Sequence, residues 1–332
     1  MHRAPSLSRA LDSGRRTWLR QAGASVAASM LGSGAFAQDD TVRIVVPFPA
    51  GNPIDAGARV LAECLRATTR RNHIVDNKPG AGGIIGSAEV ARAKPDGSVL
   101  LFTTGGHNTT AVLYSKLPYD VLRDFTPITQ LATSPGFALL VRSESRFKTV
   151  ADVLREAKAK PGTVSYGSFG PGNTTHLVGA LFARSAGVDL LHVPFKSSPL
   201  QDLMGGHIDL TWFNTSGAQE FIDHGKMRAL AISWPSRVPE LPNVPTLAEL
   251  GVKDVDIPAW TGLYGPPRMP AALVQSLYAN VVAASRQPEY TTWAKGSRVI
   301  VTNVPPQQFA SENADELRRY RRDITPLGIK LD

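Results

Sequence analysis

The chain has 332 residues, of which 42% are hydrophobic and 19% are charged, and its formal net charge is +8. This composition is typical of a globular protein and excludes a disordered or fibrous chain. Because no basic block is interleaved with aromatic residues, nucleic-acid binding is not indicated either.

The first 37 residues predict a signal peptide. Arg15 and Arg16 precede an apolar stretch that ends in Ala35-Phe36-Ala37, a small-x-small cleavage site. The stretch is too short and too rich in Gly and Ser for a membrane-spanning helix, and no run of about 18 apolar residues follows it. We therefore expect export, with cleavage after Ala37. The paired arginines fit a twin-arginine signal as well as an ordinary secretory segment, and both routes remain open.

The next part of the chain alternates strands and helices. Residues 42–48, 73–77 and 98–104 are rich in Val, Ile and Leu and predict strands, with helices between them over 53–68 and 82–93. This βαβα order predicts an α/β lobe with a largely parallel sheet.

Two extended segments, 128–134 and 136–143, follow with little room for a helix between them, and a second βα series then begins. Its predicted elements are helices over 150–160, 174–187 and 200–206 and strands over 163–168, 190–195, 207–213 and 227–233. The final helices, beginning with 271–285, have no sheet of their own to cover.

The second lobe is therefore expected to be inserted into the first. We assign residues 38–137 and 259–332 to lobe 1 and residues 138–258 to lobe 2. The two extended crossings, near 130–142 and 255–265, are expected to act as a hinge.

Two loops share one design at the end of a predicted strand. Residues 48–55 read FPAGNPID and residues 169–176 read FGPGNTTH, each with glycine and asparagine directly before a helix. Asn52 suits the N-cap of the first helix, and Asn173 or Thr174 suits that of the second. Because a helix start leaves backbone N–H groups unpaired, a small anion could lie between the two loops.

Several motifs come close to catalytic or nucleotide-binding patterns without matching them. Residues 167–174 resemble a phosphate loop, but Asn173 stands where a lysine is required. Residues 78–87 resemble a dinucleotide fingerprint whose third glycine, Gly86, falls one position late. Ser168 lacks the first glycine of a nucleophile elbow, and the seven histidines are scattered without metal-ligand spacing. We therefore expect no catalytic residue, no metal and no cofactor.

Nine segments together match one known family. They are residues 47–59 (PFPAGNPIDAGAR), 75–102, 113–128, 166–177 (YGSFGPGNTTHL), 192–196, 202–210, 225–233, 241–251 and 325–330. With these segments in register, almost all of the chain after residue 37 resembles the substrate-binding proteins of tripartite tricarboxylate transporters, the Bug-type or TctC-like periplasmic receptors. The resemblance implies a two-lobed α/β fold of the type II periplasmic-binding class. It also implies a small carboxylate held in the cleft by backbone amides and hydroxyl groups.

Carried onto this sequence residue by residue, the resemblance implies ligand contacts from both lobes. They are Phe48, Ala50, Gly51, Asn52, Asp55, Thr103, Thr104 and Gly105 in lobe 1 and Ser168, Gly170, Gly172, Asn173, Thr174, Lys196, Asp209 and Asn214 in lobe 2.

Some of these roles remain open. Asp55 either stabilises its helix start or contacts the ligand, and Lys196 is expected at the rim. Trp260 is expected in the core, as are Trp212 and Tyr264, with a wall of the cleft as the alternative for one of them. The family usually has glycine at Asn52 and an acid near Asn214, which leaves open a ligand different from that of typical relatives.

The sequence therefore predicts a monomeric periplasmic receptor and not an enzyme. It would capture a di- or tricarboxylate, an acidic amino acid or an aromatic carboxylate and deliver it to the membrane permease of a tripartite tricarboxylate transporter. Two alternatives remain: a secreted enzyme on a similar two-lobed scaffold, and an orphan sensor subunit that serves a regulatory system.

Overall fold

The computed structural model describes residues 41–196 and 198–331, except for the side chain of Ser216. The predicted signal peptide and its cleavage site lie outside the described residues. Within these ranges, no helix has the length and the hydrophobicity that crossing a membrane requires.

The first sheet has six strands in the order β11-β4-β10-β3-β1-β2. Their bounds are β1 (Thr41–Val46), β2 (Asn72–Asn77), β3 (Val99–Thr104), β4 (Thr126–Ser134), β10 (Ala259–Gly265) and β11 (Ile300–Val304). β1 pairs in parallel with β2 and β3, whereas β10 pairs antiparallel with β3 and β4.

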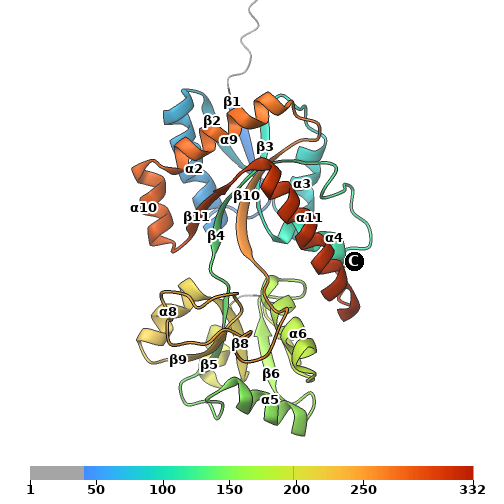
Figure 1. Cartoon of the computed structure of the whole chain (residues 1–332), viewed down its shortest axis with the longest axis vertical. Helices are drawn as coiled ribbons and strands as arrows, with labels where there is room; N and C mark the ends of the chain where they lie inside the picture. The colour runs from blue at the N-terminus through green and yellow to red at the C-terminus, as the bar shows by residue number, and fades with distance from the viewer. Residues whose placement is uncertain (1–40, 197, 332) are drawn as a thin grey trace, which may run out of the picture. The chain divides into compact units, whose positions relative to one another are not determined.

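Helices cover both faces of this sheet because its strands are apolar on both sides. On β1, Val42, Ile44 and Val46 pack in one buried cluster, and Val45 points into another. Helices α2 (Pro53–Thr69), α9 (Ala271–Ser285) and α10 (Pro288–Gly296) complete the first cluster (Figure 1). Helices α3 (Ile84–Ala91), α4 (Gly106–Leu113) and α11 (Pro306–Asp323) contribute to the second, with the short 3-10 helices η1 (Ala81–Gly83) and η2 (Thr325–Leu327) nearby in the chain.

The second sheet has five strands in the order β7-β6-β8-β5-β9. Their bounds are β5 (Phe137–Arg142), β6 (Ser165–Ser168), β7 (Leu191–Pro194), β8 (Leu210–Asn214) and β9 (Met227–Ile232). Leu139 packs toward helices α5 (Val150–Ala159) and α6 (Thr174–Ala186), and Leu140 packs toward α7 (Leu200–Gly205) and α8 (Thr215–Asp223). Both sheets are mixed. The predicted parallel pairing holds for β1 with β2 and β3 and for β6 with β7 and β8. The remaining pairs, which involve β10, β4 and β11 in the first sheet and β5 in the second, are antiparallel.

Two segments connect the sheets. β4 ends at Ser134 in the first sheet and β5 begins at Phe137 in the second, while β10 returns from Ala259 and lies beside β4 (Figure 1). Gly136, at the first crossing, has a φ of 50°, and a Cβ atom there would lie 2.6 Å from the carbonyl oxygen of Ser233. Only glycine fits this crossing without displacing the neighbouring chain.

The structure contains elements that the sequence analysis did not anticipate: α4, α8, α10 and β11. Helix α4 begins with the sequence GHNTT, in which every residue is a weak helix former. Five of its residues between His107 and Val112 are buried. The helix is therefore stabilised by packing against the sheet and α11, because its residues have a low intrinsic propensity to form a helix.

Asn52 caps α2, as the sequence predicted. Its Oδ1 atom accepts the backbone N–H groups of Ile54 at 2.8 Å and Asp55 at 2.9 Å, and Pro53 occupies the first helical position. These two bonds satisfy donors that the helix cannot pair internally. Asn173 caps α6 in the same way, through a 3.0 Å bond from the N–H group of Thr175.

Replacing the cap of α2 should therefore destabilise the protein. We expect Asn52→Ala to lower the free energy of unfolding by about 1 kcal/mol, because two N–H groups lose their acceptor. Asn52→Ser, which keeps an acceptor oxygen, should stay close to the unmodified protein. Urea denaturation of the three proteins measures the effect, and equal stability of the alanine and serine variants would contradict the capping role.

Candidate functional site

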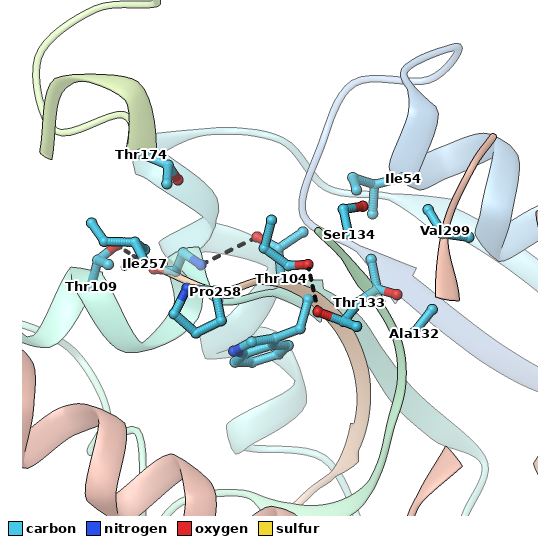
Figure 2. A pocket seen from close by; sticks show the side chains of 15 residues that line it. Ile54, Thr104, Thr109, Ala132, Thr133, Ser134, Thr174, Ile257, Pro258 and Val299 are labelled. Carbon is cyan, nitrogen blue, oxygen red and sulfur yellow. Dashed lines mark hydrogen bonds between the residues drawn. The ribbon is translucent and has the colours of Figure 1, made fainter. Parts of the chain in front are cut away.

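Two adjoining cavities lie at the carboxyl ends of β1, β3 and β6. The hinge cavity, of about 190 Å³, is lined by Ile54, Thr104, Gly105, Gly106, Thr109, Ala132, Thr133, Ser134, Thr174, Ile257, Pro258, Ala259, Trp260, Thr261 and Val299 (Figure 2). The outer cavity, of about 650 Å³, is lined by Pro47, Phe48, Pro49, Pro79, Gly80, Gly82, Gly83, Thr104, Gly106, Thr109, Thr110, Leu113, Tyr114, Phe169, Pro171, Gly172, Asn173, Thr174 and Leu331. Ligands of open α/β sheets bind at this end of the strands.

The cavities join through four shared residues that come from both sheets. Thr104, Gly106 and Thr109 belong to the end of β3 and the start of α4, while Thr174 begins α6. A ligand at this junction would contact both lobes at once.

The start of α4 lines both cavities and has no side-chain cap. Its N-cap is Gly105, which has no side chain to accept a hydrogen bond, and the N–H group of Gly106 makes only a long bond of 3.3 Å to Thr104 Oγ1. A Cβ atom on Gly105 would lie 3.2 Å from the carbonyl oxygen of Pro258, so the close packing favours glycine. Asn108, in the same turn, donates its N–H group to the carbonyl oxygen of Gly105 at 3.1 Å. The N–H groups of Gly106 and His107 therefore remain without an acceptor in the helix, which is the arrangement that binds anions at helix starts.

The start of α2 is satisfied by its own side chains. Asp55 is 2% exposed and accepts hydrogen bonds from the N–H group of Gly51 at 2.8 Å, from Arg59 at 3.0 Å and from Asn77 at 2.9 Å. Burial by itself raises the pKa of Asp55, but these hydrogen bonds outweigh it and hold the pKa below its ordinary value. With the cap bonds of Asn52, they occupy the donors that a ligand would need here.

The loop after β6 is also held from within. Ser168 is fully buried, and its Oγ lies 2.7 Å from His192 Nε2 and accepts the N–H group of Gly170 at 3.1 Å. The N–H group of Gly172 donates to His176 Nδ1 at 3.0 Å. The amides of both glycines therefore shape the loop.

The two histidine rings stack on each other, with centroids 3.8 Å apart and planes 5° from parallel. Burial, with a smaller effect from neighbouring His192, lowers the pKa of His176 to about 4, and burial also lowers the pKa of His192. Both rings are neutral near pH 7, which lets His176 accept the N–H group of Gly172.

Hydroxyl groups line the hinge cavity and its junction with the outer cavity. Thr109 donates to the carbonyl oxygen of Gly106 at 3.0 Å. Within residues 41–196 and 198–331, the hydroxyls of Ser134, Thr174 and Thr261 have no hydrogen-bond partner. These three hydroxyls can donate to a ligand.

The structure brings together six of the residues that the sequence assigned to the site: Phe48, Thr104, Gly105, Gly172, Asn173 and Thr174. Eight others line neither cavity and are Ala50, Gly51, Asn52, Asp55, Thr103, Ser168, Gly170 and Lys196. Thr103 is 2% exposed on β3, and Lys196 is exposed on the loop after β7.

The last two assigned residues also lie outside the cavities. Asp209 is at the amino end of β8, where it pairs with Arg146 at 2.7 Å and accepts the N–H group of Ser165 at 2.9 Å. Asn214 is exposed and caps α8 through a 2.6 Å bond from the N–H group of Gly217. Asp209 is therefore held by Arg146 and Ser165, and Asn214 uses its side-chain oxygen as a helix cap.

Sequence reasoning missed the contribution of α4 and the hinge strands, including Gly106, Thr109, Thr133 and Ser134. For Gly106 and Thr109, the signal that could have found them is the pair of glycines after the third predicted strand, followed by two threonines. Trp260 lines the hinge cavity, which was one of its two expected roles, while Trp212 and Tyr264 are fully buried.

A buried carboxylate supports this side of the site. Glu316 is 8% exposed and accepts hydrogen bonds from Asn108 at 2.5 Å, Tyr320 at 2.8 Å and Trp260 at 3.2 Å. Burial raises the pKa of Glu316, although these donors act in the opposite direction. Asn108 belongs to α4, and Trp260 forms one wall of the hinge cavity, so Glu316 holds both α4 and this wall in place.

Among the described residues that line the two cavities, none is charged. Among the described residues, no group of three or more His, Cys, Asp or Glu side chains is arranged to hold a metal ion. The contact between Ser168 and His192 resembles that of a nucleophile and its base. Ser168 is fully buried and lines neither cavity, so a ligand in the cavities would not reach it. The geometry supports binding through N–H and hydroxyl donors.

Comparisons with known proteins agree with this geometry. Residues 57–329 match the family described as "Tripartite tricarboxylate transporter family receptor". The structure of the periplasmic binding protein BugD is similar, with a TM-score of 0.72 and 30% identity over 87% of this chain and 98% of that one.

Two structures from Rhodopseudomonas palustris are similar and contain a ligand. MatC with bound malate has a TM-score of 0.72 and 30% identity over 86% of this chain and 98% of that chain. Rpa4515 with adipate has a TM-score of 0.74 and 30% identity over 87% of this chain and 98% of that chain.

These similarities confirm the two-lobed α/β fold and the family that the sequence indicated. They also confirm a binding protein in place of an enzyme, because the family consists of transporter receptors. The chain belongs to the receptor family of the tripartite tricarboxylate transporters.

Proposed function

We propose that the protein captures a small carboxylate between its two lobes in the periplasm and delivers it to the permease of a tripartite tricarboxylate transporter. The observation that supports this most is the junction of the cavities, where Thr174 of the second lobe faces the same space as Thr104 and Gly106 of the first. A ligand there would draw the lobes together by bonding to both.

The donors at the junction and along the hinge cavity suit a carboxylate. The first turn of α4 offers backbone N–H groups, and Ser134, Thr174 and Thr261 offer hydroxyls. Each charge-assisted hydrogen bond contributes about 1.5–3 kcal/mol. After the cost of ordering the ligand and the side chains around it, a few such bonds give a binding free energy of about −8 kcal/mol, which corresponds to micromolar affinity.

The relatives named above support the same ligand class, since one holds malate and another holds adipate. For this protein we propose a di- or tricarboxylate, an acidic amino acid or an aromatic carboxylate as candidates. We also propose that it works as a monomer after export and cleavage behind Ala37. Its lobes would be residues 38–137 with 259–332, and 138–258.

Binding and closure can be tested together. We expect calorimetry to find at least one carboxylate that binds and is recovered unchanged. Small-angle scattering should then give a smaller radius of gyration with that ligand than without it, because the lobes must approach to contact it. Failure of every carboxylate to bind would contradict the function. Binding with an unchanged radius of gyration would contradict the hinge.

Thr174 should contribute directly to affinity. Thr174→Val keeps the shape of the side chain but leaves a desolvated ligand oxygen without a donor, at a cost of about 1–3 kcal/mol, or roughly five- to more than a hundred-fold in Kd. Thr174→Ser keeps the hydroxyl and should bind nearly as well as the unmodified protein. Calorimetry on the two variants measures the effect. An equal loss of affinity in both variants would show that the hydroxyl of Thr174 does not contact the ligand.

The pH dependence should follow from His176. Its pKa of about 4 in the folded protein keeps it neutral, so affinity should be constant between about pH 6.5 and 8. In the unfolded chain, the same histidine becomes protonated at about pH 6.5. Stability should therefore fall as the pH drops from about 6.5 toward about 4.

Denaturation curves of the unmodified protein and of His176→Phe across this range measure the effect. The stability difference between the two should shrink as the pH falls, because the phenylalanine variant lacks the titrating group. The matched control is His224→Phe at an exposed histidine, which should leave the pH profile unchanged. A pH-independent difference for His176→Phe would refute the assignment.

A further inference from the structure

The last described residue of the chain reaches the outer cavity. Leu331 lines this cavity together with Leu113 and Tyr114 of the first lobe and Pro171 and Gly172 of the second. Among the described residues of this lining, none belongs to β4, β5 or β10, the strands at the two crossings between the sheets. The contact that Leu331 makes here is therefore separate from those crossings.

The C-terminal segment is anchored on the last turn of α4. The backbone N–H group of Leu331 donates to the carbonyl oxygen of Leu113 at 3.0 Å, and the Nζ atom of Lys330 donates to that of Val112 at 3.3 Å. The last carbonyl groups of a helix have no partner within it, and a cation near them is favourable. Leu331 is thus fixed to the same helix whose start borders both cavities.

From this anchor, the side chain of Leu331 packs on the loop before α6. A Cβ atom on Gly172 would overlap the Cδ1 atom of Leu331, so the leucine lies directly against the backbone of this loop. Gly172 has a φ of 72°, a left-handed conformation that other residues rarely adopt. Thr174 follows two residues later and begins α6. The packing of Leu331 therefore bears on the position of Thr174.

A second contact joins the same two parts of the chain. Arg184, in the last turn of α6, donates to the carbonyl oxygen of Asp323, the last residue of α11, at 2.7 Å. The C-terminal part of the chain thus contacts α6 at both ends. Leu331 packs on the loop before this helix, and Asp323 accepts a bond from its last turn.

We propose that Leu331 is a positioning residue of the ligand site. It holds the loop before α6 against α4, so that Thr174 faces Thr104 and Gly106 before any ligand binds. The inference rests on the proposed function, in which the ligand lies at the junction of the cavities. A site that is arranged in advance loses less free energy to ordering when the ligand arrives, so Leu331 raises the affinity without donating a hydrogen bond.

The positioning can be measured without a ligand. The protein is unfolded and refolded to remove any bound ligand. Spin labels are placed at Lys116→Cys, in the loop after α4, and at Lys196→Cys, in the loop after β7; both positions are exposed, whereas the native Cys64 is buried. Double electron–electron resonance then gives the distance between the labels. Leu331→Ala should shift this distance to longer values or broaden its distribution, because alanine is too short to reach Gly172.

Ile329→Ala is the matched control. Ile329 belongs to the same segment and packs, like Leu331, against the hydrophobic core, but it lines neither cavity. Its replacement should leave the distance unchanged. An unchanged distance in Leu331→Ala, or an equal shift in the two variants, would overturn the positioning role.

The role in binding is tested through Thr174. Malate, adipate, glutamate and benzoate are titrated by calorimetry into the unmodified protein, Leu331→Ala, Thr174→Val and the double variant. For an acid that binds, Leu331→Ala should lower the affinity about three- to tenfold. Because Leu331 acts through Thr174, the same substitution should lower the affinity by less than about twofold in the Thr174→Val background.

The outcomes separate the two proposals. If the unmodified protein binds none of the four acids, the proposed function fails and Leu331 loses its role in the ligand site, even if the distance shifts. If an acid binds and Leu331→Ala binds it as tightly, or loses affinity equally in both backgrounds, the inference fails alone. A shifted distance together with a loss of affinity that depends on Thr174 supports the inference.

Discussion

The buried carboxylate of Glu316 is the constraint on which the first-lobe side of the site depends. Its partners Asn108, Trp260 and Tyr320 belong to α4, β10 and α11, three elements far apart in the sequence. A desolvated carboxylate that loses a partner costs several kcal/mol. The three elements are therefore fixed relative to one another. This places the uncapped start of α4 beside Trp260 in the hinge cavity.

The second lobe achieves the same rigidity with neutral groups. His176 and Ser168 accept the amides of Gly172 and Gly170, and His192 supports both through stacking and a hydrogen bond. A loop that satisfies its own amides loses little freedom when a ligand arrives, so more of the binding energy remains as affinity. Thr174, which follows this loop, lines both cavities, and its hydroxyl has no hydrogen-bond partner among the described residues.

Most of the fold could be predicted from the sequence because apolar periodicity and caps are local signals. Asn52 is such a case, since its acceptor role depends on residues two and three positions away. Helix α4 gives no such signal, because long-range packing stabilises its weak helix formers. The roles of Asp209 and Ser168 were equally hidden: their partners Arg146 and His192 lie 63 and 24 residues away, and spacing alone does not reveal a tertiary partner.

The differences from the usual family pattern can now be assigned physical roles. Asn52 and Asn214, which first pointed to an altered ligand, both use their side-chain oxygens to cap helices. Neither side chain lines either cavity, and the role that the structure shows for both is at the helix starts. On the proposed function, selectivity would depend on the residues that line the hinge cavity, whose described members carry hydroxyl and aliphatic groups and no charge. The shape of that cavity and the placement of its hydroxyl groups would then discriminate between carboxylates.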